Sequence, residues 1–219
     1  MNKLPNFHKA FDYENAFYLT CDITRISKII AQYELYKMSN DRPGAIVECG
    51  VFKGGYLARF AMFRDLLNNP YSKKIIAFDV FGKFPKTQFQ QDKEFRNKFI
   101  SEAGQDSISK KQMMKVLKHK GIDKSIELIK GDITKTVPAY LRSHPSLRLS
   151  LLNIDTDIYE PAVTILEYFY PRVVKGGVII LDDYGIFPGE TKAVENYFKD
   201  KNVQIRKFPF AMTPSYIIK

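Results

Sequence analysis

Short apolar runs alternate with stretches of helical spacing along this chain of 219 residues. Continuous apolar runs of about 4–8 residues are typical of strands that are buried on both faces of a parallel sheet. The runs that fit this pattern lie at residues 45–48, 75–79, 126–129, 149–154 and 178–181. Because helical stretches separate them, we predict a doubly wound α/β fold, with a mostly parallel sheet and helices on both faces.

The helical stretches carry apolar residues on one face and have recognisable ends. One helix is predicted to begin after Asp22, a suitable N-cap, within a helical leader that covers residues 1–44. Other helices are predicted near residues 57–67, 108–120 and 161–170. Gly121 ends the second of these, and Pro161 suits the first turn of the third.

No strand or helix period is visible between Phe81 and Gly104, where the chain is polar, aromatic and rich in Gln and Lys. We therefore predict an irregular insertion there, and we expect the wider segment 81–120 to form a lid over a bound substrate. Near the C-terminus, the glycines of residues 175–177 are expected to turn the chain into the strand at 178–181. The last runs, 203–208 and 215–218, predict strands that pair antiparallel at an edge of the sheet.

The composition favours one domain, residues 1–219, with a single substantial core. No basic-then-apolar leader and no uncharged apolar stretch of about 18 residues is present, so we expect a cytoplasmic protein without a membrane span. Cys21 and Cys49 lack the spacing of a disulfide framework or a zinc site. Cys49 is expected to be a small buried apolar residue.

The formal net charge of +10 is concentrated between Lys83 and Lys124, which contains eleven Lys or Arg and five Asp or Glu. Such a surface attracts a phosphate-bearing substrate or nucleic acid, although a solvated helix face has the same composition.

The turn after the first strand, residues 47–55, resembles a nucleotide-binding loop but does not suit a diphosphate. Phe52 stands where a dinucleotide fingerprint needs its middle glycine, and no Lys-Ser or Lys-Thr pair follows Gly55. Glu48 at the strand end would repel a diphosphate and attract a cation. S-adenosylmethionine has an ammonium and a sulfonium group and no phosphate, so we predict that its aminoacyl end binds here.

Acids after successive strands complete the predicted cofactor site. Asp79 is expected to accept hydrogen bonds from the ribose hydroxyls, and Asp132 from the adenine amino group. The alternative is that these aspartates only cap helices. The residues predicted to bind the cofactor are Glu48, Gly50, Gly54, Gly55, Tyr56, Asp79, Asp132 and Asp155.

The fourth and fifth strands end in two pairs of aspartates: Asp155 and Asp157, then Asp182 and Asp183. Clustered carboxylates repel one another unless a cation or shared protons hold them together, which predicts bound Mg²⁺ or Mn²⁺. Such a metal would lower the pKa of an acceptor hydroxyl while a neighbouring aspartate takes its proton. Helix capping by Asp157 and a turn at Asp183 remain the alternatives.

These motifs resemble the macrocin and mycinamicin sugar O-methyltransferases and the bacterial sugar methyltransferases related to them. The resemblance covers most of the chain and rests on residues 13–19, 47–55, 78–81, 154–161 and 180–184, of which the last two blocks are the most specific. It implies a class I methyltransferase sheet of seven strands that ends in an antiparallel strand. It also implies S-adenosylmethionine at Glu48, Gly50, Asp79 and Asp132.

The resemblance further implies a metal at Asp155, Asp182 and Asp183, a sugar hydroxyl as acceptor, and Asp155 or Asp157 as the general base. The expected partner is a small-molecule or glycan acceptor, with a phosphate group and a homodimer left open. Two alternatives remain at this point. A nucleic-acid methyltransferase would suit the charge, but no Asn/Asp-Pro-Pro-Tyr loop for an extruded base is present. The other is a protein that binds the cofactor without turnover.

Overall fold

A seven-stranded sheet forms the centre of the computed structural model, which describes residues 3–219. Its strand order is β3-β2-β1-β4-β5-β7-β6. The strands are β1 Ala45–Cys49, β2 Ile75–Asp79, β3 Ile126–Lys130, β4 Leu149–Ile154, β5 Val173–Leu181, β6 Arg206–Lys207 and β7 Ser215–Ile218. The first five are parallel, while β7 pairs antiparallel with β5 and β6. The predicted doubly wound fold with antiparallel strands at its edge is confirmed.

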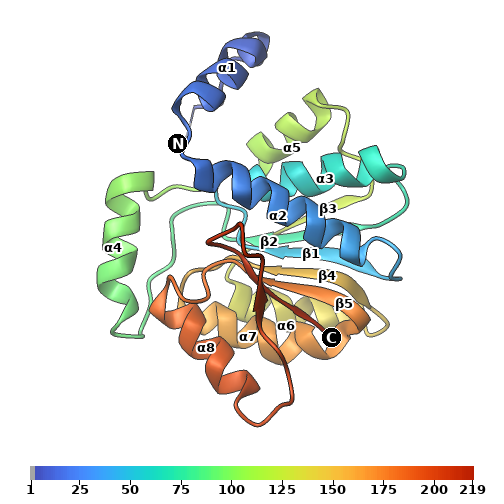
Figure 1. The fold of residues 1–219 in the computed structure, drawn as a ribbon, viewed down its shortest axis with the longest axis vertical. Coiled ribbons are helices and arrows are strands. Elements are labelled where there is room, and N and C mark those ends of the chain that lie inside the picture. The colour runs from blue at the N-terminus through green and yellow to red at the C-terminus, as the bar shows by residue number, and fades with distance from the viewer. Residues whose placement is uncertain (1–2) are drawn as a thin grey trace.

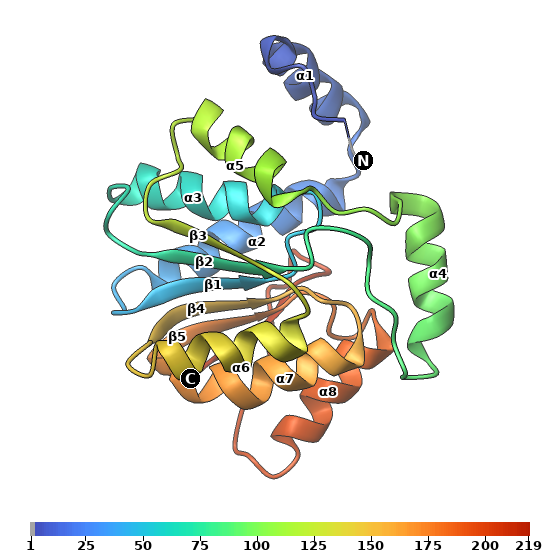
Figure 2. The ribbon, with the colours of Figure 1, turned by 180° about the vertical axis from the view of Figure 1, so that it is seen from behind.

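Helices cover both faces of the sheet, as Figures 1 and 2 show. The helices on one face are α2 Ile23–Ser39, α3 Gly55–Leu67 and α5 Lys110–His119, and those on the other are α6 Ile133–Ser143, α7 Tyr159–Phe169 and α8 Pro188–Phe198. Each side has its own apolar core, packed around Phe60 and Leu117 on the first and around Phe78 and Phe169 on the second. Cys49 is fully buried, as predicted, and unpaired.

The N-terminal helix lies outside this arrangement. After the 3₁₀ turn Phe7–Lys9, helix α1 Ala10–Thr20 projects from the body of the protein and buries none of its residues (Figure 1). Asp22 then caps α2 through the amide of Thr24, as the sequence indicates. Across residues 3–219, every helix is too short or too polar to cross a membrane.

Several predicted boundaries were wrong. The segment predicted to be irregular contains helix α4 Asp92–Ala103, which packs through Phe95 and Phe99 against Phe187. Helices α6 and α8 were not predicted at all. Strand β5 begins at Val173, so residues 175–177 lie inside it; Gly176, at φ +77°, forms an irregularity in the strand rather than the turn before it.

Candidate active site

A cavity of about 1030 Å³ opens at the carboxyl ends of the central strands, where a sheet of this topology binds its ligands. Residues of the turns after β1, β2, β3, β4 and β5 line it, together with residues of α2 and of the segment before α4. Most predicted site residues reach this cavity, and the exceptions are Glu48 and Gly54.

The glycines of the turn after β1 are required by the packing of the backbone. A Cβ atom on Gly50, which has φ +94°, would overlap the carbonyl oxygen of Asp155, so the glycine lets the ends of β1 and β4 come together. Gly54, at φ +86°, precedes the first turn of α3 and lies against Met113. Gly50, Gly55 and Tyr56 line the cavity.

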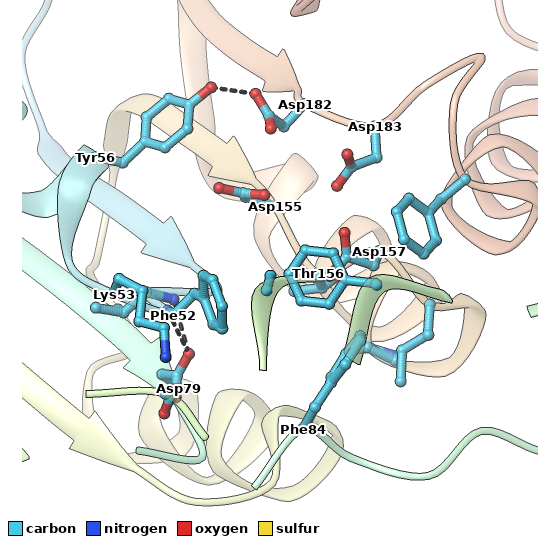
Figure 3. Close-up of a pocket in the computed structure, with 18 of the residues that line it drawn as sticks. Phe52, Lys53, Tyr56, Asp79, Phe84, Asp155, Thr156, Asp157, Asp182 and Asp183 are labelled. Carbon is cyan, nitrogen blue, oxygen red and sulfur yellow. Dashed lines mark hydrogen bonds between the residues drawn. The ribbon is translucent and has the colours of Figure 1, made fainter. Parts of the chain in front are cut away.

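Asp79 lines the cavity and also holds this turn in place. Its Oδ2 accepts hydrogen bonds from the amides of Val51 at 2.8 Å and Phe52 at 3.1 Å (Figure 3). Its Oδ1 accepts from the amide of Phe81 and from the hydroxyl of Ser107. Each oxygen therefore already has two donors, and a ribose hydroxyl would have to share or replace one of them.

Glu48 lies behind the cavity wall. It is fully buried, and neither carboxylate oxygen has a hydrogen bond to a residue of the described chain. Burial raises the pKa of Glu48 well above its usual value, although the Arg59 charge opposes the shift. Its register neighbour on β4, Asn153, is equally buried, and both polar atoms of its amide lack partners.

Asp132 follows β3 and combines the two roles considered from the sequence. Its side chain caps α6 by accepting from the amide of Thr134 at 3.0 Å and from the Thr134 hydroxyl at 2.7 Å. It also lines the cavity. The capping role is therefore observed, and it does not remove Asp132 from the cavity.

Three carboxylates from the loops after β4 and β5 form an acidic cluster, defined here as Asp155, Asp157 and Asp183. One oxygen of each lies within 4.8 Å of the others, and their side chains surround one space in Figure 3. Burial, followed by repulsion between the acids, raises the pKa of each well above its usual value. Asp157 adopts a positive φ of 62°, which is uncommon for a residue other than glycine.

Asp182 has partners within the protein. Lys28 of α2 forms a salt bridge of 2.7 Å with its Oδ2, and the Tyr56 hydroxyl donates to its Oδ1. Burial alone would lower the pKa of Lys28, but attraction to Asp182 and Asp155 outweighs that effect and raises the pKa. The structure thus groups Asp157, in place of Asp182, with the two other residues of the predicted metal site.

The family of the chain follows from comparison with known proteins. Residues 21–209 match the sequence profile of the family described as Macrocin-O-methyltransferase (TylF). The chain belongs to this family. The mycinamicin III 3''-O-methyltransferase of Micromonospora griseorubida is 30% identical over 161 residues, or 71% of this chain and 60% of that enzyme. The demethyldecarbamoylnovobiocin O-methyltransferase of Streptomyces niveus is 25% identical over 170 residues, or 73% of the chain and 60% of that enzyme. The chain thus spans less than two thirds of the length of these relatives.

Two solved structures have the same fold as this chain. The calicheamicin methyltransferase CalS11 superimposes with a TM-score of 0.78 at 24% identity, over 99% of this chain and 87% of the CalS11 chain. The O-methyltransferase NovP gives a TM-score of 0.73 at 20% identity, over 89% of this chain and 80% of the NovP chain.

Sequence reasoning missed two charged residues of this macrocin-type site. Lys28 lies on a helix that precedes the sheet, 154 positions before its partner Asp182, and nothing local indicates the pairing. Glu190, in the first turn of α8, is fully buried and accepts hydrogen bonds from the amides of Asp183 and Thr156. Its only local signal is the acidic first turn after Pro188, and helix α8 itself was not predicted.

Two carboxylates fix the segment before α4, and the first residue of α4, to the body of the protein. Glu160 accepts hydrogen bonds from the Thr87 hydroxyl and from the amides of Gln88 and Phe89. Asp92, fully buried, accepts from the amide of Tyr159 at 2.9 Å and from the amide of Gly189 at 2.7 Å. These bonds attach the predicted insertion to the first turns of α7 and α8.

Proposed function

We propose that this protein transfers the methyl group of S-adenosylmethionine to a hydroxyl group of a sugar, with a divalent metal ion assisting. One observation carries the proposal: in a chain of this family, the acidic cluster faces the same cavity as the glycine turn and Asp79. A cofactor and an acceptor bound in one cavity can bring the methyl carbon within reach of the hydroxyl oxygen.

The proposed cofactor position follows the strand ends. Asp79 and Asp132 line the cavity and offer carboxylates to the ribose and adenine, while the turn containing Gly50, Gly55 and Tyr56 faces the aminoacyl end. The carboxylates near this turn would attract the positively charged ammonium and sulfonium groups of the cofactor. Because Glu48 lies behind the wall, its proposed contact with the ammonium group requires a shift of the turn.

The residues of the acidic cluster fit a hard divalent cation. All three offer oxygen ligands, which Mg²⁺ and Mn²⁺ prefer, and their mutual repulsion makes a cation favourable there. Asp155 and Asp183 belong to the predicted ligand set. Asp157 lies close enough to them to act as the third ligand, whereas Asp182 would first have to break its salt bridge with Lys28. The bound metal would supply Lewis acidity that lowers the pKa of an adjacent hydroxyl.

The remaining chemistry belongs to the protein. Asp155 or Asp157 would accept the hydroxyl proton at a carboxylate oxygen, a contribution typically of about 10²–10⁴ in rate. The cavity walls would hold oxygen, methyl carbon and sulfur in line, which can supply about 7–11 kcal/mol. Positioning is therefore expected to be the largest catalytic effect.

Three aromatic side chains mark the proposed acceptor side of the cavity. Phe84, Phe99 and Phe187 line the cavity, with Phe99 in contact with both of the others, and aromatic faces suit the apolar faces of sugar rings. Arg25 and Lys86 also line the cavity, and their positive charges suit a phosphate-bearing acceptor. The name of one relative from Streptomyces olivaceus, 28% identical over 149 residues, specifies a rhamnosyl acceptor.

A methyl-transfer screen tests the proposal. The protein would be incubated with isotope-labelled S-adenosylmethionine, Mg²⁺ and a panel of deoxysugar nucleotides, glycosides and oligonucleotides, and the products analysed by mass spectrometry. We expect a labelled methyl ether on a sugar hydroxyl. Labelled bases in the oligonucleotides, with no labelled sugar, would contradict the proposal.

A further inference from the structure

Glu190 is a buried carboxylate that touches both acidic loops without reaching the cavity. Its Oε1 accepts from the amide of Asp183 at 3.0 Å, and its Oε2 accepts from the amide of Thr156 at 3.4 Å. Its own amide donates to the carbonyl oxygen of Asp157 at 3.2 Å. One residue therefore contacts the backbone of the loop after β4 and of the loop after β5.

These two loops need an external constraint. They carry the acidic cluster, whose members repel one another, and Asp157 holds an uncommon positive φ. Asp157 and Asp183 share a side-chain hydrogen bond, and the remaining repulsion among the acids has to be opposed by bonds to the backbone of the loops. In the described chain, Glu190 is the side chain that accepts from amides on both loops at once.

We infer that Glu190 is a positioning residue that sets the spacing of the acidic cluster for a divalent cation. This inference rests on the proposed metal-assisted function. Both oxygens of Glu190 are directed at backbone amides, and the residue is absent from the cavity lining, so it acts through the loops and not as a ligand.

The bonding pattern requires a carboxylate. A glutamine has the same shape but only one acceptor oxygen, so its NH₂ group would face one of the two amide donors. Glu190→Gln should therefore release one loop while it preserves the volume of the side chain. Glu195, an exposed residue on the same helix, offers a matched control as Glu195→Gln.

A second variant separates a specific effect of Glu190 on the spacing of the loops from a general loss of stability. Asp92 bonds the amides of Tyr159 and Gly189, close to the same loops, but makes no contact with the amides of Thr156 or Asp183. Asp92→Asn should lower the thermal stability while changing the metal affinity less than Glu190→Gln does.

The test is a Mn²⁺ titration of the purified protein, with free Mn²⁺ measured by electron paramagnetic resonance. We expect Glu190→Gln to weaken Mn²⁺ binding at least about tenfold relative to Glu195→Gln, with S-adenosylmethionine affinity within about threefold. Equal Mn²⁺ affinity of these two variants, or an equal loss in Asp92→Asn, would overturn the inference.

Two further outcomes are distinguishable. If the unaltered protein binds no Mn²⁺, the proposed metal role is wrong, and the inference about Glu190 is wrong as well. If Glu190→Gln does not fold, Glu190→Asp serves instead; it keeps the charge but is one methylene shorter, so it should also weaken Mn²⁺ binding. Unchanged binding in that variant would overturn the inference.

Discussion

The same isosteric change at Asp157 and at Asp182 should have opposite effects on stability. Asp157 belongs to the acidic cluster, whereas both oxygens of Asp182 are bonded to Lys28 and Tyr56. In chelated buffer at pH 8, Asp157→Asn removes a repulsive charge and should stabilise the protein. Asp182→Asn leaves Lys28 without its closest counter-charge and should destabilise it.

The magnitudes follow from the distances. Two ionised carboxylates whose oxygens lie within 4.8 Å of each other repel by roughly 3.5 kcal/mol or more at an effective dielectric constant of about 20. Proton uptake by the buried cluster already relieves part of this repulsion, so we expect a gain of about 1–3 kcal/mol for Asp157→Asn. The Lys28–Asp182 pair is 2.7 Å long, with side chains 21% and 3% exposed, and its weakening should cost about 1–3 kcal/mol.

Urea unfolding and Mn²⁺ titration of both variants provide the assay. We expect Asp157→Asn to be more stable without metal and to bind Mn²⁺ at least about tenfold more weakly, the loss for about one charged ligand contact. Asp182→Asn should be less stable and retain most of its Mn²⁺ affinity. The reverse pattern of Mn²⁺ affinities would refute this reasoning and favour Asp155, Asp182 and Asp183 as the ligands.

Three further predictions follow from the structure. The raised pKa values of the acidic cluster favour the folded state at low pH, so the free energy of unfolding of the chelated protein should fall as the pH rises from the usual range of an aspartate through the raised values, by about 1.4 kcal/mol per pH unit for each proton released. Unfolding midpoints measured with EDTA and with Mg²⁺ should diverge increasingly over that rise in pH. Asp79→Ala should weaken S-adenosylmethionine binding by about 1.5–3 kcal/mol, because the amides of Val51 and Phe52 lose their acceptor; unchanged calorimetric affinity would count against the assignment. Asp92→Ala should speed limited proteolysis within residues 81–104, because the hydrogen bonds from the amides of Tyr159 and Gly189 are lost. Equal cutting rates in the variant and the unaltered protein would show that these two bonds do not anchor the segment.

The sequence predicted the fold where the pattern was local. Strands β1, β2 and β4 appear as mainly apolar runs because both of their faces are covered, and all of their residues are buried. Helix α4 could not be recognised in the same way, since its apolar side chains meet Phe187 from a distant part of the chain. Asp132 illustrates a different limit: the same residue type caps a helix and lines a cavity, and only the structure shows that it does both.

The residues of the candidate site could likewise be predicted only where the signal was local in the sequence. The rule that ligands bind at the carboxyl ends of parallel strands placed Asp79, Asp155 and Asp183 on the cavity, where they are found. It could not show that Glu48 lies behind the wall, because side-chain direction at a strand end depends on the following turn. Lys28 and Glu190 were missed because their partners lie on other elements.

The most direct test of the central claim is methyl transfer under exhaustive chelation. With an acceptor sugar from the panel and labelled S-adenosylmethionine, we expect a methyl ether to form in Mg²⁺ and at least about a hundredfold more slowly in EDTA, with the rate restored by Mg²⁺ or Mn²⁺. Transfer at the full rate by the chelated protein would contradict the metal role, and the aspartates would then act as a metal-free base and as helix caps.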